Sequence, residues 1–150
     1  MRLTVHTDYA IRTLIFLAIR DEKLATISDI SEQYQISKNH MMKVAQELVH
    51  HKFVISERGR NGGLRLARAA SEINLGDVIQ KMEADFYLVS CLDPEKNNCK
   101  IAGNCGAQTI MHEAITAFFE VFRQYTLEDA VVNEKNLKKM FLTELEVSET

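Results

Sequence analysis

The chain has 150 residues, of which 46% are apolar, and a formal net charge of −3, so it suits one domain with an appendage and can form a hydrophobic core. It contains no apolar stretch of about 18 residues that could span a membrane, and no recognisable signal peptide. Free cysteines without a targeting segment indicate the cytoplasm, and the lack of a recognisable nucleophile–base pair or paired carboxylates argues against an enzyme.

Charge is distributed unevenly along the chain. Residues 1–70 contain 11 Lys/Arg against 7 Asp/Glu, a net charge of +4, whereas residues 71–150 contain 7 against 14, a net charge of −7. This asymmetry predicts a basic N-terminal module, able to bind nucleic acid, joined to an acidic C-terminal part.

Two helices are predicted in the first 35 residues. Thr7 can cap the first, and Asp8 lies in its first turn, where the helix dipole favours a negative charge. The second is short and begins at Thr26, where Thr-Ile-Ser-Asp resembles a capping box with Asp29 in place of glutamate. Asp8 therefore has an ordinary structural role available to it at a helix start.

A third helix is predicted from its cap, Ser37, to about His50, after a turn at residues 35–36. Its apolar side chains recur at the spacing of one buried helix face, and its polar side chains lie on the opposite face. Two short helices joined by a tight turn, the second basic at its outer N-terminal end, predict a helix-turn-helix. The residues expected to face the major groove of DNA are Ser37, Lys38, Asn39, His40 and Lys43.

A β-hairpin is predicted directly after this helix. Residues 53–56 form one strand and residues 64–66 the other, with a glycine-rich, arginine-bearing tip between them. An ordinary surface hairpin is the alternative, but a helix-turn-helix followed by a basic hairpin predicts a winged helix whose tip can place arginine in the minor groove. The wing residues expected to meet the minor groove or phosphates are Arg58, Arg60 and Asn61.

A fourth helix is predicted to start at Asn74, and a loop that holds every cysteine of the chain follows it. Cys91, Cys99 and Cys105 are spaced Cys-x7-Cys-x5-Cys among proline, asparagine and glycine residues that favour turns. Three thiolates in a polar loop indicate a soft metal or an iron–sulfur site with one further ligand from elsewhere. Buried apolar cysteines remain an alternative, whereas an odd number of cysteines argues against a structural disulfide.

A long helix is predicted from Gln108, with an apolar face wider than a small domain needs. One stripe can pack on its own domain and the other on a second copy, which gives a two-fold homodimer that presents two recognition helices to a palindromic site. A helix buried on two sides within one chain is the alternative. A short helix at 126–129 and an amphipathic helix at 134–145 are predicted to complete the chain.

The predicted fold class is mainly α with a small β-hairpin: a winged helix-turn-helix plus a long C-terminal dimerisation helix. We expect a DNA-binding domain at 1–85, a cysteine loop at 86–107, and the dimerisation helix with a C-terminal extension at 108–150. Over about residues 1–132 the sequence resembles the winged-helix iron–sulfur repressor family. The resemblance rests on Leu3-Thr4-x-x-Thr7-Asp8-Tyr9-Ala10-x-Arg12, on residues 36–44 and 58–63, and on the cysteine loop.

Within that family the chain is most similar to the nitric-oxide-sensing branch, on residues 37–40 and 125–129. The resemblance implies a homodimeric repressor that holds a 4Fe–4S cluster through Cys91, Cys99 and Cys105 and releases operator DNA when nitric oxide attacks the cluster. A 2Fe–2S cluster is the alternative. The resemblance also implies that the partner subunit's Asp8 can complete the ligation. Another branch of the family uses a histidine after the third cysteine, which makes His112 the other candidate for the fourth ligand. Two further functions stay open: a regulator of iron–sulfur biogenesis or iron homeostasis, and a structural zinc-binding winged-helix protein.

Overall fold

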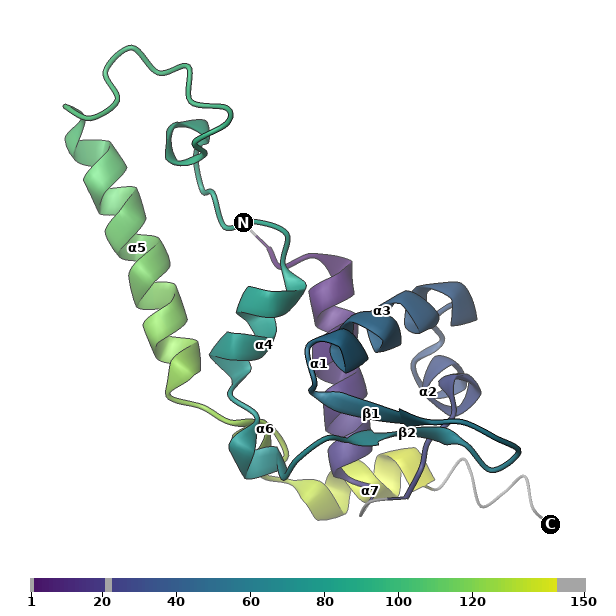
Figure 1. The fold of residues 1–150 in the computed structure, drawn as a ribbon. Coiled ribbons are helices and arrows are strands. Elements are labelled where there is room, and N and C mark those ends of the chain that lie inside the picture. The colour runs from purple at the N-terminus through teal and green to yellow at the C-terminus, as the bar shows by residue number, and fades with distance from the viewer. Residues whose placement is uncertain (1, 21–22, 143–150) are drawn as a thin grey trace.

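Helix α1 (Val5–Ala18) runs through the middle of the structure, a computed structural model that describes residues 2–20 and 23–142 (Figure 1). The buried side chains of α1 are Thr7, Ala10, Thr13, Leu14, Phe16 and Leu17. They occupy more than one face of the helix, so other elements can pack around it from several sides. This helix is the central support of the fold.

The N-cap of α1 is Thr4, which corrects the prediction that Thr7 caps this helix. The Thr4 hydroxyl accepts a hydrogen bond from Thr7 N at 3.3 Å. Thr4 thereby satisfies a backbone amide that has no partner inside the helix, and α1 starts before Thr7. Thr7 itself is a fully buried polar residue. Asp8 lies in the first turn, as predicted.

Helices α2 (Ile27–Tyr34) and α3 (Lys38–His50) form the predicted helix-turn-helix. The capping box at the start of α2 is reciprocal: Thr26 N donates to Asp29 Oδ2 at 2.8 Å, and Asp29 N donates to Thr26 Oγ1 at 3.1 Å. Gln35 adopts a left-handed φ of 53°. This conformation ends α2 and lets the chain reverse toward α3.

The predicted wing is an antiparallel pair of strands, β1 (Val54–Glu57) and β2 (Gly63–Leu66), in which Val54 lies opposite Leu66. Both strands begin within one residue of their predicted positions. The base of the hairpin is tied to the segment before α2, because Leu64 N donates to Ala25 O at 2.8 Å and Ala25 N donates to Leu64 O at 3.0 Å. A Cβ at Gly63 would lie 2.9 Å from Ala25 O, so glycine permits this close approach.

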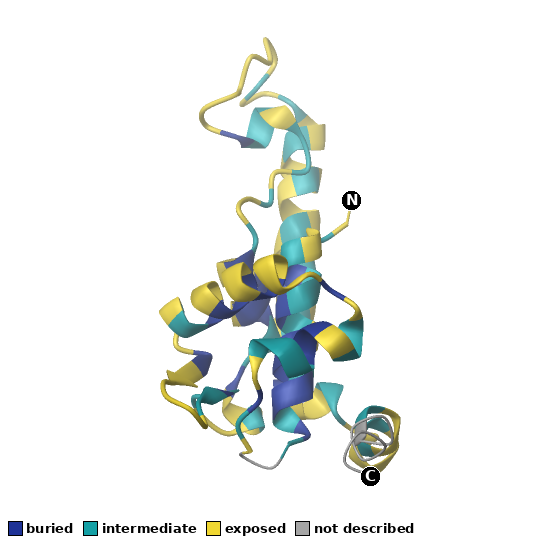
Figure 2. Cartoon of the chain, turned by 90° about the vertical axis from the view of Figure 1, so that its right-hand side faces the viewer, coloured by how far each residue is buried: buried dark blue, intermediate teal, exposed yellow. Residues whose placement is uncertain are grey.

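Helices α1 to α3 and the wing, with η1 (Ala70–Glu72) and α4 (Leu75–Met82), form the body of the structure. After α4 the chain leaves the body, passes through the cysteine loop with η2 (Ser90–Leu92), and returns along α5 (Gly106–Arg123). The loop lies at the end of α5 that is far from the body (Figure 1). Helix α5 begins two residues before its predicted start. Phe119 is the only buried residue of α5, and Figure 2 shows the rest of the helix exposed or half-buried. Within the described part of the chain, every helix falls short of the length and apolar character that a membrane span requires.

The C-terminal end of α5 is fixed to the body. Asn74, which caps α4 as predicted, also donates from Nδ2 to Arg123 O at 2.7 Å. Helix α6 (Leu127–Ala130) follows as the predicted short helix, and Leu127 is fully buried with its N donating to Ile73 O at 2.8 Å. These bonds join the end of α5 to the start of α4, so α5 is anchored at its base.

Helix α7 (Glu134–Leu142) returns to the winged-helix part of the chain and packs there (Figure 1). The ring of Phe141 makes edge contacts with Phe16 and Tyr34, at 5.7 Å and 5.6 Å between ring centroids. The predicted final helix is therefore confirmed over its described part, and its predicted end at 143–145 lies outside the described residues.

Phe141→Ala is expected to lower the free energy of unfolding by about 1–3 kcal/mol, because each ring–ring contact contributes about 0.5–1.5 kcal/mol. Urea denaturation followed by circular dichroism measures the change. Met140→Ala is the matched control, since this neighbouring side chain is 72% exposed and its removal should cost less than about 0.5 kcal/mol. Equal stability of the two variants would contradict the packing of α7 on α1 and α2.

Candidate nucleic-acid interface and cysteine loop

The outer face of α3 carries the residues predicted to face the major groove. Ser37 caps the helix by accepting a hydrogen bond from His40 N at 3.3 Å, while Met41 and Val44 on the opposite face are buried in the core. The predicted contact residues Ser37, Lys38, Asn39, His40 and Lys43 are all exposed. Their contact with DNA stays a prediction, and α3 offers them to it on an accessible surface.

The tip of the wing presents positive charge to the solvent. The predicted wing residues Arg58, Arg60 and Asn61 are all exposed. Arg65, on β2, is held instead in an ion pair with Glu57 at 2.7 Å. Among the described residues neither Arg58 nor Arg60 has such a partner, so both charges are available for phosphates or for the minor groove.

The first turn of α1 touches the recognition helix at two points that no sequence pattern predicted. His6 Nε2 lies 3.1 Å from Glu47 Oε2, although the two residues are 41 positions apart in the chain. The rings of Tyr9 and His40 meet at 6.1 Å between centroids. Asp8 lies between His6 and Tyr9 in the sequence, within the part of α1 that contacts α3.

The Asp8 carboxylate is engaged within its own helix. Its Oδ2 lies 2.9 Å from Arg12 Nε, and both side chains are about half exposed. Arg12 is placed in turn by Tyr34, whose ring centroid lies 5.9 Å from the guanidinium and whose hydroxyl donates to Arg12 O at 3.0 Å. Burial raises the pKa of Tyr34 to about 12, so the hydroxyl keeps the proton that makes this bond well above neutral pH. The ion pair engages one carboxylate oxygen of Asp8, and the half-exposed side chain can offer the other to a second partner.

The cysteine loop joins α4 to α5 and carries three free thiols. Cys91 lies in η2 and is half-buried, Cys99 is exposed, and Cys105 is half-buried as the N-cap residue of α5. A local turn orders the first half of the loop, because Asp93 Oδ1 accepts a hydrogen bond from Glu95 N at 2.9 Å. This bond holds the pKa of Asp93 below its usual range.

The donor set of the loop suits a soft metal or an iron–sulfur group. Thiolates are the ligands that such groups select, and no disulfide consumes any of the three. The described residues nevertheless contain no group of three or more His, Cys, Asp or Glu side chains placed to hold a metal ion. The predicted ligands Cys91, Cys99, Cys105 and Asp8, and the alternative His112, are therefore not gathered into one site within this single chain. Binding requires the loop to close and a further donor to approach.

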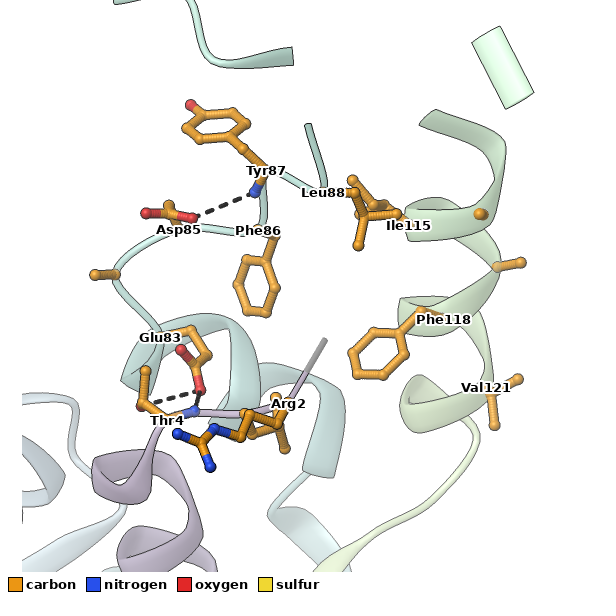
Figure 3. Close-up of a pocket in the computed structure, with 14 residues that line it drawn as sticks. Arg2, Thr4, Glu83, Asp85, Phe86, Tyr87, Leu88, Ile115, Phe118 and Val121 are labelled. Carbon is orange, nitrogen blue, oxygen red and sulfur yellow. Dashed lines mark hydrogen bonds between the residues drawn. The ribbon is translucent and has the colours of Figure 1, made fainter. Parts of the chain in front are cut away.

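An apolar cleft of ≈ 670 Å³ separates α5 from the N-terminal segment and from the linker after α4 (Figure 3). One rim is fixed by Glu83, whose Oε1 accepts hydrogen bonds from Thr4 N at 2.6 Å and from Thr4 Oγ1 at 3.0 Å. Its apolar lining includes Phe86, Leu88, Ile115, Phe118 and Val121. Helix α5 thus has an accessible apolar side beside the linker that leads to the cysteine loop.

A winged helix-turn-helix with a basic recognition face, joined by a long helix to a loop of three thiols, defines a DNA-binding transcriptional regulator. The chain belongs to the Rrf2 family, whose model, described as an iron-dependent transcriptional regulator, matches residues 3–133. It is a transcriptional regulator of the NsrR type and not an enzyme, as the sequence predicted. Membership of this family implies an iron–sulfur group.

Similarity to known regulators extends over most of the chain. The HTH-type transcriptional regulator NsrR of Bacillus licheniformis is 45% identical over 141 residues, which cover 93% of this chain and 99% of that protein. NsrR of Oceanobacillus iheyensis is 46% identical over 138 residues, which cover 91% of this chain and 94% of that protein.

Two solved structures share the winged-helix fold with its long C-terminal helix. T. potens IscR has a TM-score of 0.71 at 20% identity over 89% of this chain and 88% of that one. CymR, the global cysteine regulator of B. subtilis, has a TM-score of 0.66 at 23% identity, and the match covers 87% of this chain and 95% of that one.

Proposed function

We propose that this regulator is a homodimeric repressor that senses nitric oxide through a 4Fe–4S cluster and releases operator DNA when nitric oxide attacks the cluster. The observation that carries the proposal is the loop of three free thiols at the start of α5, in a chain 45% identical to an NsrR regulator. Cys91, Cys99 and Cys105 would supply three ligands. A 2Fe–2S cluster is the alternative, because three thiolates do not by themselves determine the number of irons.

The exposed apolar side chains of α5 support a two-fold homodimer. Ile110 is 64% exposed and Val121 is 53% exposed, and Val121 also lines the apolar cleft beside α5. Large apolar side chains that are contiguous with an apolar cleft are typical of an interface between copies of a chain. A two-fold dimer would present two α3 helices to a palindromic operator, about one DNA turn apart.

The fourth ligand in this proposal is the partner subunit's Asp8. When bound, the cluster supplies iron that nitric oxide can attack. In this chain the Asp8 carboxylate pairs with Arg12 through Oδ2, and its half-exposed position at the start of α1 makes it accessible to the partner's loop. A carboxylate is a harder and less well matched ligand than a thiolate for such a group, so this position is the most easily displaced. His112, exposed on α5, is the alternative donor.

Signal transmission in this proposal uses contacts that the chain already makes. His6 and Tyr9 flank Asp8 and touch Glu47 and His40 of α3, so release of Asp8 would loosen the support of the recognition helix. An ordered cysteine loop would also hold α5, and through its anchored base the two wings, in register with the operator. The required coupling is small, because about 1.4 kcal/mol already changes affinity tenfold.

Anaerobic purification followed by iron, sulfide and zinc analysis, an absorbance spectrum and an operator-binding assay tests the proposal. The expected result is a coloured protein that binds operator DNA and is released by nitric oxide. A colourless protein with one zinc per chain would indicate a structural zinc site instead. Release of DNA by a different stimulus, such as iron–sulfur demand, would indicate a regulator of cluster biogenesis.

Asp8→Ala is expected to change the absorbance spectrum of the cluster and its rate of reaction with nitric oxide, because one ligand is lost. Stopped-flow absorbance measures both quantities. Arg12→Ala is the matched control, since it removes the same ion pair but keeps the carboxylate, and it should retain the spectrum. A wild-type spectrum and reaction rate in the Asp8 variant would leave this residue with a helix-start role alone.

A further inference from the structure

The side chain of Gln108, in the first turn of α5, bridges the two ends of the cysteine loop. Its Nε2 donates to Cys91 O at 3.2 Å, and its Oε1 accepts from Gly103 N at 2.8 Å. Neither bond is part of the hydrogen-bond ladder of α5, because both partners lie outside the helix. One half-buried amide thus contacts the backbone at the first thiol and the backbone just before the third.

The other side-chain bonds of the loop are local. Asp93 accepts from Glu95 N and Asn97 accepts from Cys99 N, and each of these pairs is separated by two positions in the chain. The bond from Gln108 to Cys91 spans 17 positions. Among the described residues, Gln108 is the only one whose side chain bonds to both ends of the loop. Removing the Gln108 amide would leave the local turns intact and delete the side-chain hydrogen bonds that join the two ends.

The backbone at Gly103 is adapted to this contact. Gly103 has a φ of +83°, a left-handed conformation that residues with side chains rarely adopt. In this conformation its N–H meets the Gln108 carbonyl oxygen, and only one residue separates it from Cys105. The position of Cys105 therefore depends on the same amide that holds the backbone of Cys91.

We propose that Gln108 is a positioning residue that holds Cys91 and Cys105 as a preorganised pair of thiols for a soft metal or an iron–sulfur cluster, while the exposed Cys99 closes over it. The proposal rests on the assignment of the loop as the metal site. A loop whose ends are already joined loses less conformational entropy when it closes around a ligand, so preorganisation raises affinity. Gln108 does not touch the metal in this arrangement.

Cobalt(II) titration of the reduced, metal-stripped full-length protein tests this role, because the thiolate-to-cobalt absorption band reports both affinity and the number of bound thiolates. Gln108→Ala is expected to weaken cobalt binding about tenfold, because the order that the two hydrogen bonds give the loop before binding is lost. The band at saturation should keep the wild-type intensity. The matched control is Thr109→Ala, the exposed neighbour in the same turn, which should bind cobalt as the wild type does.

Hydrogen exchange at the Gly103 amide gives a second readout that needs no metal. Exchange should be faster in Gln108→Ala than in the wild type and in Thr109→Ala, while the helix content of all three stays the same. Wild-type cobalt affinity in Gln108→Ala, or an equal loss in Thr109→Ala, would overturn the positioning role. A wild-type protein without a thiolate-to-cobalt band would instead overturn the assignment of the loop as the metal site.

Discussion

Cys99→Ala is expected to abolish the visible absorbance of the cluster and to weaken operator binding at least about tenfold, the effect of a modest coupling free energy. Cys99 is the exposed thiol of the loop, so its removal leaves no cavity in the core and should not unfold the protein. With two thiolates left, the loop can no longer close around the cluster. In the proposed mechanism, the recognition helices and wings then lose the ordered support that places them on DNA.

Absorbance spectroscopy and fluorescence anisotropy with labelled operator DNA, both under anaerobic conditions, measure the two effects. Asn98→Ala is the matched control, because it removes an exposed side chain from the adjacent position of the same loop. That variant should keep the colour, the operator affinity and the response to nitric oxide. If Cys99→Ala bound DNA as tightly as the wild type and still responded to nitric oxide, the thiols would have no part in sensing.

Helix starts could be predicted where a side chain caps the backbone within three residues. The capping box of Thr26 and Asp29 and the cap at Ser37 start α2 and α3 as predicted. The error at Thr7 shows the limit of such patterns. Thr4 and Thr7 both suit a helix start, and only the tertiary packing that buries Thr7 distinguishes them.

The candidate site could be predicted by residue type but not by geometry. Cysteine spacing identifies soft donors in a loop, yet nothing in it indicates that Gln108 reaches a carbonyl 17 positions earlier. The contacts of His6 with Glu47 and of Tyr9 with His40 also join distant parts of the chain. Such contacts follow from the packing of α1 on α3 and leave no periodic or capping signal in the sequence.

Removing the two wing arginines is expected to have the largest effect on DNA binding that leaves the cysteine loop untouched. Arg58→Ala and Arg60→Ala should each weaken operator binding about tenfold at moderate salt, and the double variant should bind more weakly still. An arginine that neutralises one phosphate contributes about 0.9 to the slope of log K against log salt, so its removal should lower the slope by that amount. Because a dimer carries each arginine twice, each single variant should lower the salt slope by about two. Anisotropy titrations at several salt concentrations measure both quantities.

Two variants distinguish a local contact from a general effect of charge. Lys135→Ala removes one positive charge from an exposed position on α7, a helix that is not part of the wing, and should leave affinity and salt slope unchanged. Arg65→Ala removes an arginine of the same hairpin that is already paired with Glu57, so its effect on the salt slope should be smaller than that of either tip arginine.

A loss of affinity in Arg60→Ala without a change in the salt slope would indicate that Arg60 inserts into the minor groove. The size of that loss should then vary with the base sequence at the contacted position. Wild-type affinity in the double variant would show that the recognition helix binds DNA without the wing, and that the exposed charges at the tip serve only solubility.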